Sequence, residues 1–341
     1  MSGVTPAHLD HSRDWRDFDY CYPVISRRSG GLSLGVNINL DKACNFDCVY
    51  CEVCRRHPPR RKDVDLDQLE REMRALLDMA LSGGLFATEP VAKPAGFATG
   101  RRHRLRPAAA GSGVSDRKQT RYDTQPETAD GREQTRSRGF ETTSTGGKCP
   151  RLNDMAFSGD GEPTTAAEFP AAVSRLAGLR KDHGLQDLKI VLITNSTMLQ
   201  APSVVGALDE MMENGGEIWA KLDSGLEGRY RAVNRSNIPL GDIQANLAFA
   251  GGRWPLVIQT MFLEWQGRPP LDDELAAYAD TIGRLLDAGI KLQGLHLYTV
   301  ARPTPEPGAR PLPSAAIDRI AEYVKGRLPG VSVDVFYGPV A

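Results

Sequence analysis

The stretch LSLGVNINLDKACNFDCVYCEVC, residues 32–54, joins a predicted buried strand to a loop crowded with cysteines. Its first part, residues 32–40, is rich in Leu, Val and Ile, as in a strand that is covered on both faces. Four of the chain's six cysteines follow it, at Cys44, Cys48, Cys51 and Cys54. This order predicts a strand whose end presents several thiols to one ligand.

Outward from this loop, apolar strands alternate with amphipathic helices. Apolar residues recur at helical spacing over 66–81, 169–184, 203–215, 271–289 and 314–328. Short apolar runs predict further strands at 154–159, 188–195, 217–224, 255–263, 291–300 and 331–338. Alternating strands and helices indicate an α/β fold with parallel βαβ units, wound into a barrel or an open sheet. About six such units fit the length, too few for a closed eight-stranded barrel.

The bulk composition indicates a large folded core. The chain has 341 residues, 40% of them hydrophobic, which suffices for one large domain or two smaller ones. No run approaches the ~18 apolar residues of a membrane span, and the polar N-terminus lacks the apolar stretch of a secretory signal. We therefore expect a cytoplasmic protein. Thiols stay reduced in that compartment, so the cysteine cluster indicates metal binding or redox chemistry.

Residues 93–151 interrupt this pattern. They carry thirteen Lys/Arg and six Asp/Glu, a net +7, which leaves 29 against 37, or −8, for the rest of the chain. With few large apolar residues, this segment cannot bury enough surface to offset its ordering entropy. It is either a solvated loop or, through RRHRLR (101–106), a nucleic-acid-binding arm. The predicted organisation is an N-terminal arm over 1–31, a barrel over 32–92 and 150–341, and a disordered insertion over 93–149.

Polar segments follow three of the predicted strands. They are SGDGEPT (158–164), TNST (194–197) and KLDSG (221–225). In parallel α/β folds the carboxyl ends of the strands lie at one face, where ligands bind. We therefore expect these segments to lie beside the cysteine loop. The glycines of the first segment would let backbone groups approach a ligand closely.

The thiol spacing is compatible with more than one metal group. Structural zinc sites usually combine two ligand pairs separated by roughly a dozen residues or more, and the sequence has no second pair. Closely spaced thiolates also suit a [4Fe–4S] cluster. With Cys54 as fourth ligand the cluster would be an electron carrier, whereas three ligands would leave one iron open to another molecule. Zinc, electron-carrier and open-cluster sites are therefore all candidates.

The motif Cys44-x3-Cys48-x2-Cys51, with Tyr50 before its last cysteine, resembles the signature of the radical S-adenosylmethionine (radical SAM) superfamily. The resemblance implies that these three cysteines bind a [4Fe–4S] cluster and that SAM chelates its fourth iron. An electron from a reductant such as flavodoxin or ferredoxin would then cleave SAM to a 5′-deoxyadenosyl radical, which abstracts hydrogen from the substrate. The implied fold is a partial (β/α)6 TIM-type barrel. Residues 22–52 further resemble stand-alone Fe–S oxidoreductases related to wyosine-type tRNA enzymes.

The same resemblance assigns a SAM contact to the turn after the second predicted strand. Asp160, Gly161 and Glu162 are similar to the GGE motif of the superfamily, which holds the SAM amino group. Valine in place of Gly161 is then expected to fill the space of SAM while the cluster stays bound.

Five more residues are candidate SAM contacts by this resemblance: Tyr50, Thr194, Asn195, Lys221 and Asp223. Tyr50 would pack near the cluster and the adenine, Lys221 would pair with the SAM carboxylate, and Asp223 would contact the ribose. Each also has an ordinary structural interpretation. Tyr50 would be a loop aromatic, Thr194 and Asn195 a helix cap, and Lys221 and Asp223 a structural ion pair.

Two hypotheses for the function follow. The first is a radical SAM enzyme acting on an unidentified substrate. The second is a non-catalytic metal-binding or electron-transfer protein that contacts nucleic acid through its basic insertion.

Outside the motifs, His296 is either a core residue or a residue of the barrel lumen. Arg27 and Arg28 either contact a phosphate-bearing substrate or cap the bottom of the barrel.

Overall fold

The computed structural model of the chain describes Arg13, Arg55 and residues 15–53, 63–86, 140–142 and 148–338. The prediction for Cys54, and that of a disordered insertion over 93–149 as far as residues 93–139 and 143–147 are concerned, lie outside the described residues. Residues 140–142 and 148–149 of that range belong to two short strands instead. Within the described ranges, no helix has both the length and the apolar character needed to cross a membrane.

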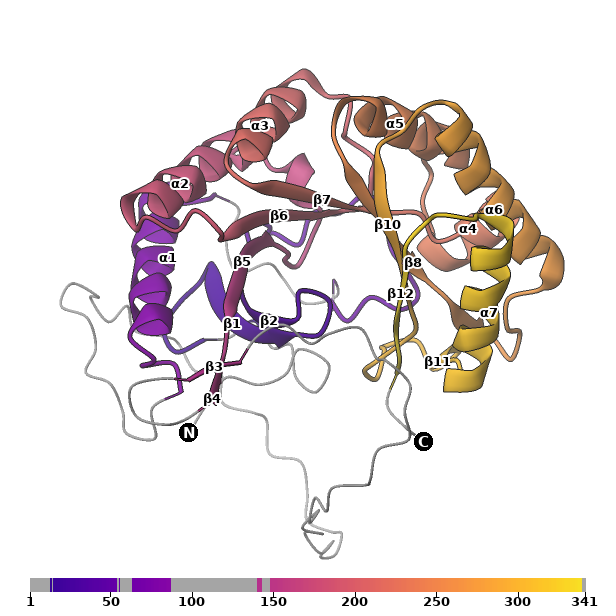
Figure 1. Cartoon of the computed structure of the whole chain (residues 1–341), viewed down its shortest axis with the longest axis horizontal. Helices are drawn as coiled ribbons and strands as arrows, with labels where there is room; N and C mark the ends of the chain where they lie inside the picture. The colour runs from indigo at the N-terminus through magenta and orange to yellow at the C-terminus, as the bar shows by residue number, and fades with distance from the viewer. Residues whose placement is uncertain are drawn as a thin grey trace, which may run out of the picture. The chain divides into compact units, whose positions relative to one another are not determined.

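One curled, eight-stranded sheet forms a half-barrel at the centre of the fold (Figure 1). Its order is β1-β2-β5-β6-β7-β8-β10-β12. At one edge β1 runs antiparallel to β2, and all other neighbours are parallel. The strands are β1 Cys21–Ser26, β2 Gly31–Val36, β5 Leu152–Phe157, β6 Lys189–Thr194, β7 Gly216–Lys221, β8 Leu256–Met261, β10 Leu292–Tyr298 and β12 Val333–Phe336. The predicted mixed α/β class is confirmed.

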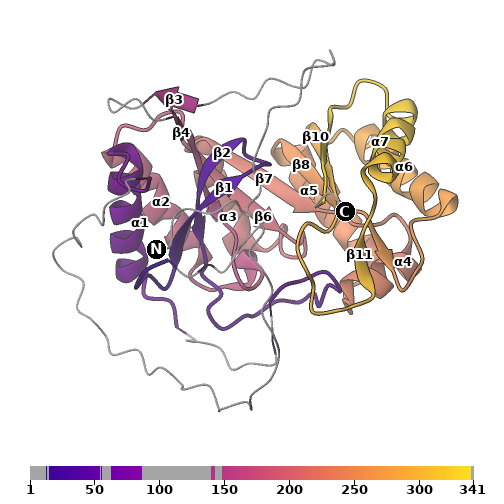
Figure 2. The same ribbon diagram turned by 90° about the horizontal axis from the view of Figure 1, so that it is seen from below.

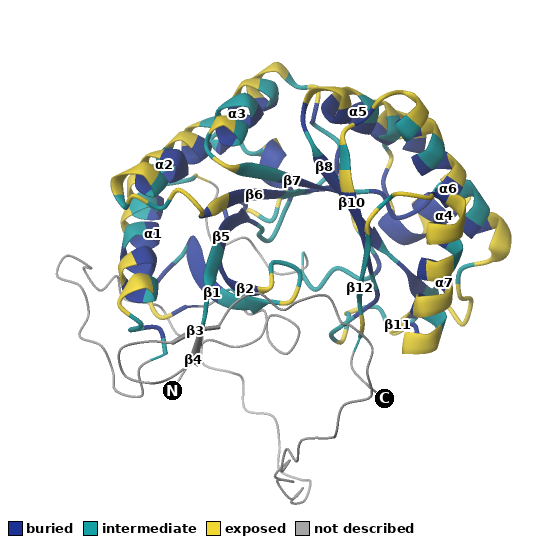
Figure 3. Ribbon diagram, viewed as in Figure 1, coloured by how far each residue is buried: buried dark blue, intermediate teal, exposed yellow. Residues whose placement is uncertain are grey.

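Seven helices surround the outer face of this sheet in the described part of the chain (Figure 1). They are α1 Leu66–Leu81, α2 Phe169–Asp182, α3 Pro202–Glu213, α4 Glu227–Asn234, α5 Leu240–Arg253, α6 Asp272–Asp287 and α7 Ser314–Arg327. Their sheet-facing sides are buried and their outer sides exposed (Figure 3). In Figure 2, α7 lies beside α6, and it packs on β10 and β12. Short elements complete the fold: η1 Pro163–Thr165, β9 Leu263–Trp265, which pairs with β11 Ala309–Pro311, and β3 Phe140–Thr142, which pairs with β4 Lys148–Pro150.

Most predicted elements are present with bounds shifted by one to three residues, and α1 has the predicted bounds. The strand predicted over 32–40 ends at Val36, and this part of the prediction was wrong. The cause is local: the backbone N–H of Asn39 donates to the side chain of Asn37 at 3.1 Å, which turns the chain out of the sheet. β1, α4, α5 and the short strands β3, β4, β9 and β11 were not predicted from the sequence.

The first strand is fixed to the sheet by a carboxylate from α1. Glu72 is fully buried and accepts the backbone N–H groups of Asp19, Tyr20 and Cys21 at 2.9, 2.8 and 3.0 Å. Burial raises the pKa of Glu72, while these hydrogen bonds oppose the shift. Residues 21–26, expected within an N-terminal arm, therefore form an edge strand of the sheet.

A second buried carboxylate gives the fold a dependence on pH. Asp154 in β5 accepts a hydrogen bond from Ser33 in β2, and burial raises its pKa from 3.8 to about 6. The pKa of Asp154 is higher in the folded state than in the unfolded state, so the folded state favours the protonated carboxyl. The contribution of Asp154 to the free energy of unfolding is therefore complete below pH 3.8 and is lost as the pH rises through about 6. Asp154→Asn is therefore expected to be more stable than the wild type at pH 8, by up to about 3 kcal/mol.

Urea unfolding at pH 5 and pH 8 measures this difference. The exposed Asp187→Asn serves as the control and is expected to leave stability unchanged at both pH values. A stability difference between Asp154→Asn and the wild type that is the same at pH 5 and pH 8 would contradict the assignment.

Candidate functional site

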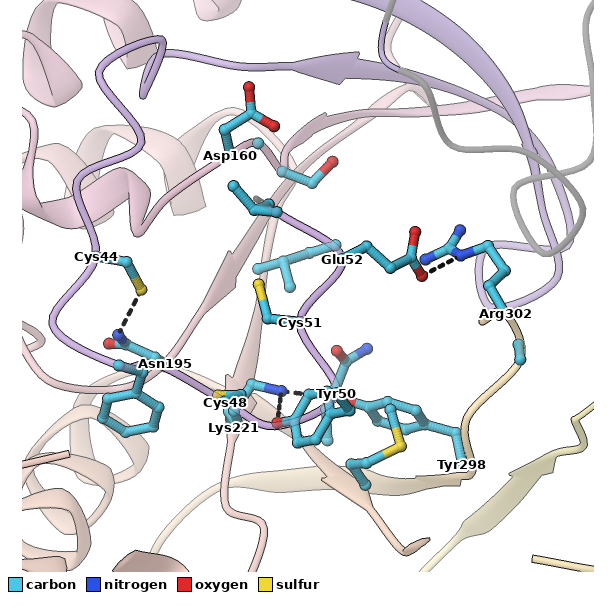
Figure 4. Close-up of a pocket in the computed structure, with 18 of the residues that line it drawn as sticks. Cys44, Cys48, Tyr50, Cys51, Glu52, Asp160, Asn195, Lys221, Tyr298 and Arg302 are labelled. Carbon is cyan, nitrogen blue, oxygen red and sulfur yellow. Dashed lines mark hydrogen bonds and ion pairs between the residues drawn. The ribbon is translucent and has the colours of Figure 1, made fainter. Parts of the chain in front are cut away.

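A pocket of about 320 Å³ lies at the carboxyl ends of the strands, within the usual range for small-molecule sites. Its wall contains the three cysteines of the predicted motif, from the loop after β2 (Figure 4). The rest of the wall comes from Arg13, the turns after β1, β5 and β6, the segment after β10, and the ends of β7, β8, β10 and β12. Of the predicted site residues, the pocket wall contains Cys44, Cys48, Tyr50, Cys51, Asp160, Gly161, Glu162, Thr194, Asn195 and Lys221.

Each of the three cysteine sulfurs accepts a hydrogen bond from a side-chain N–H. Asn195 donates to Cys44 over 3.8 Å, as Figure 4 shows, and Asn234 donates to Cys48 over 3.4 Å. Arg55 donates to Cys51 over 3.4 Å. Such donors stabilise charge on sulfur, and hydrogen bonds to sulfur are a recognised control on iron–sulfur clusters.

The chemistry of the donor set, three thiols on one loop, is that of a thiolate-bound metal site. Among the described cysteines none forms a disulfide, so all three thiols are available. Burial raises the pKa of Cys44, and it raises that of Cys48 to about 12, so binding would require a metal to displace the thiol protons. Within the described ranges, no group of three or more His, Cys, Asp or Glu is gathered closely enough to hold one metal ion. Soft sulfur ligands of this kind select zinc, copper(I) or iron–sulfur clusters.

The cysteine loop is held on one side by the end of α4. The backbone N–H of Asp47 donates to the carbonyl of Asn234 at 3.0 Å, and that of Val49 to Val233 at 2.9 Å. These carbonyls belong to the last turn of a helix, where they have no partner within the helix. Val49 is also fully buried in an apolar cluster with Val233, Leu263 and Val300. An element that the sequence analysis did not predict therefore positions the loop.

On its other side the loop contacts the glycine-rich turn after β5. The backbone N–H of Glu162 donates to the carbonyl of Ala43 at 2.9 Å. A Cβ at Gly161 would overlap that carbonyl and lie 2.7 Å from the Cβ of Asn39. Gly161 is therefore required first by the approach of two backbone segments. This differs from the expectation that its missing side chain makes room only for a ligand.

The carboxylates of the turn already have protein partners. Glu162 is buried and accepts hydrogen bonds from the Thr194 hydroxyl at 2.7 Å, the Asn195 N–H at 2.6 Å and the Thr164 hydroxyl at 2.6 Å. Burial raises its pKa, and these donors oppose the shift. Glu162 thus connects the turn to β6, and the Thr194 hydroxyl is engaged in the same way.

Asp160 is held from two sides. Its carboxylate pairs with Arg13, which also lines the pocket. It also accepts the side-chain N–H of Asn37 at 2.9 Å, while its own backbone N–H donates back to Asn37 at 3.1 Å. The two carboxylates expected to receive an ammonium group are therefore anchored by the chain itself.

Tyr50 and Lys221 form a polar network at the floor of the pocket, shown in Figure 4. Lys221 Nζ donates to the hydroxyls of Tyr50 at 2.9 Å and Tyr298 at 3.1 Å, and lies 3.7 Å from the Asp223 carboxylate. Asp223 also accepts from Tyr50 and, at 2.6 Å, from Asn234. Burial is the largest single influence and opposes the charge on Lys221, but the attractions of Asp223, Tyr298 and Cys48 together outweigh it, so the pKa lies above its ordinary value. Lys221 is therefore a cation.

Of the predicted site residues, Asp223 alone lies outside the lining of this pocket. Its side chain has no exposed surface. The structure therefore places Asp223 behind Tyr50 and Lys221, where it orients both.

Replacement of Lys221 tests this network. Lys221→Met is expected to destabilise the fold by about 3 kcal/mol, because it leaves the Asp223 carboxylate buried without its cation. Lys189→Met is the matched control: its pair with Glu217 is exposed, and its loss should cost at most about 1 kcal/mol. The double variant Lys221→Met/Asp223→Asn should recover most of the stability. Equal unfolding free energies for the two single lysine variants would refute the proposed pairing.

Several residues of the site were not predicted from the sequence. Arg13, Glu52, Tyr298 and Arg302 line the pocket from segments far apart in the chain. Glu52 and Arg302 form an ion pair at one end of it (Figure 4). Arg13, Tyr298 and Arg302 lie in no motif, whereas Glu52 directly follows Cys51 of the cysteine motif. Gln259 could have been identified as a candidate from the sequence, since it is a polar residue within the apolar run 255–263.

Comparison with known proteins does not assign the chain to a family. No family model matches the chain, and no curated protein matches it.

Proposed function

We propose that this chain is a radical SAM enzyme, with a [4Fe–4S] cluster held by Cys44, Cys48 and Cys51. The observation that carries the proposal is that these cysteines share one pocket with the glycine-rich turn after β5. Each sulfur also has its own N–H donor, which suits a bound thiolate. When bound and reduced by one electron from a flavodoxin- or ferredoxin-type donor, the cluster and SAM would supply a 5′-deoxyadenosyl radical, with release of methionine, that abstracts hydrogen from the substrate.

The strand and helix order supports the partial (β/α)6 barrel that belongs to this proposal. Six pairs follow one another along the chain: β2 with α1, β5 with α2, β6 with α3, β7 with α4 and α5, β8 with α6, and β10 with α7. The first strand, β1, and the last, β12, lie at the two edges of the sheet. The pocket lies at the carboxyl ends of these strands, where barrel enzymes have their active sites.

Different residues of the pocket would bind different groups of SAM. Lys221 is a cation in the pocket wall and would receive the carboxylate. Because the carboxylates of Asp160 and Glu162 have protein partners, the SAM amino group would be received chiefly by backbone carbonyls of the turn. Asn195 donates to Cys44 and would orient this ligand. Tyr50 would line the space beside the cluster.

Anaerobic reconstitution with iron and sulfide tests the metal assignment. The protein is expected to become brown, with broad visible absorption from thiolate-to-iron charge transfer, and to hold about four irons per chain. A protein that stays colourless and binds zinc in preference would contradict the proposal.

A further inference from the structure

Several arginines line the pocket, one of them over the ring of Tyr298. The lining contains six basic residues and three acidic ones. Every acidic residue already has a partner: Glu52 pairs with Arg302, Asp160 with Arg13, and Glu162 accepts hydroxyl and N–H donors. The lining therefore has an excess of positive charge.

Lys221 and Arg55 pair with carboxylates outside the lining, Asp223 and Asp47. Arg27 and Arg28, in the turn that follows β1, are the remaining basic residues of the lining. Arg27 donates to the backbone carbonyl of Tyr337 at 2.8 Å, and Arg28 donates to the Gln259 side chain at 2.9 Å. Among the described residues, neither forms an ion pair with a carboxylate. Burial and the neighbouring guanidinium of Arg302 both lower the pKa of each arginine. A bound anion would relieve this repulsion.

A chain of polar contacts fixes the position of Arg28. Gln259, which accepts from Arg28, lies 3.3 Å from Nδ1 of His296. Burial, followed by the charge of Arg28, lowers the pKa of His296 to about 3, so the ring is neutral and its Nδ1 accepts from Gln259. The other ring nitrogen then carries the proton and lies 3.8 Å from the carboxylate of Asp334.

Aromatic rings cover the Arg28 guanidinium as well. Its carbon lies 5.4 Å from the centre of the Tyr298 ring and 5.8 Å from that of Trp219. Rings at these distances hold a guanidinium by cation–π attraction. Arg28 is therefore positioned by both polar and aromatic neighbours, an arrangement that resembles a preorganised binding group more than a mobile surface side chain.

We infer that the substrate of the proposed reaction is a small molecule with a phosphate group, which is bound by Arg27, Arg28 and Arg302. This inference rests on the proposed function, since it places the phosphate in the same pocket as SAM. The planar fork of arginine matches phosphate oxygens in a bidentate geometry. The volume of about 320 Å³ favours a small molecule over a folded nucleic acid. Gln259 and His296 are positioning residues that act through Arg28.

Calorimetric titration of the reconstituted full chain with pyrophosphate and with inorganic phosphate tests the inference. Arg28→Ala and Arg302→Ala are each expected to weaken pyrophosphate binding about tenfold or more, because each removes charge-assisted hydrogen bonds. Arg28→Lys should retain part of the affinity, since it keeps the charge and loses the fork. Arg253→Ala is the matched control, because Arg253 pairs with exposed Asp209 outside the pocket and should leave binding unchanged.

The role of Gln259 is tested by a double-mutant cycle. Gln259→Met should weaken pyrophosphate binding in the wild type and have no further effect in Arg28→Ala, because it acts only by holding Arg28. Additive effects of the two substitutions would refute the positioning role.

Failure of this inference is distinguishable from failure of the proposed function. If the wild type forms its cluster and cleaves SAM while Arg28→Ala binds pyrophosphate as the wild type does, the phosphate site is refuted and the enzyme class stands. If pyrophosphate binding depends on Arg28 but no cluster forms, the enzyme class is refuted. Titration with a single-stranded RNA dodecamer is the third measurement. Binding of RNA that depends on Arg28, without binding of pyrophosphate, would overturn the small-molecule assignment.

Discussion

Alanine in place of Cys44, Cys48 or Cys51 is expected to abolish iron incorporation. Each sulfur lines the same pocket and has its own N–H donor, and a cluster with two thiolate ligands would lose an anchoring bond as well as charge. Iron and sulfide content after anaerobic reconstitution, together with the visible spectrum, measures the effect. All three variants should be close to colourless.

Cys21→Ala is the matched control for these variants. Cys21 is also buried, but its thiol donates to the Leu69 carbonyl at 3.7 Å in the contact between β1 and α1. The variant should keep full iron content and lose only a little stability. Full iron content in any of the three motif variants would contradict the ligand assignment.

Valine in place of Gly161 is expected to remove both iron binding and SAM binding. The substituted Cβ would overlap the carbonyl of Ala43, which directly precedes the first cysteine of the motif, so the turn and the cysteine loop could not keep their contact. Such overpacking against backbone typically costs about 3 kcal/mol. This expectation differs from the one drawn from sequence alone, in which the cluster survives.

Gly178→Val provides the comparison for this variant. Gly178 lies on the exposed face of α2, where a Cβ would meet nothing within 4 Å. It should therefore leave iron content and SAM binding unchanged. If Gly161→Val retains iron and loses only SAM, the contact between turn and loop does not hold the cysteines in place, and the expectation from sequence is restored.

Much of the fold could be predicted from the sequence, because its elements have strong local patterns. The apolar spacing of residues 66–81 defines α1, and the apolar run 188–195 contains β6. Elements with weaker patterns were missed. α4 is short and carries charged residues, and β1 contains Pro23, which is atypical of a strand. Its first residue, Cys21, donates its backbone N–H to Glu72, a residue that is distant in the sequence.

In the candidate site, too, the features with a local sequence pattern could be predicted and those that depend on distant residues could not. The cysteine spacing and the glycine-rich turn are local patterns, and the structure brings both to one pocket. Long-range partners such as Asn234, which donates to Cys48, could not be predicted, because no short motif specifies them. The roles of Asp160 and Glu162 also depend on their partners. Only the structure shows that Arg13 and the β6 end already engage these carboxylates.

Release of 5′-deoxyadenosine tests the central claim most directly. Reconstituted wild-type protein is to be reduced with dithionite in the absence of oxygen, incubated with SAM, and analysed by chromatography for 5′-deoxyadenosine and methionine. We expect slow formation of both products without any added substrate, and none with Cys48→Ala, whose sulfur lines the pocket. A wild-type protein that carries a full cluster but neither binds nor cleaves SAM would contradict the radical SAM assignment.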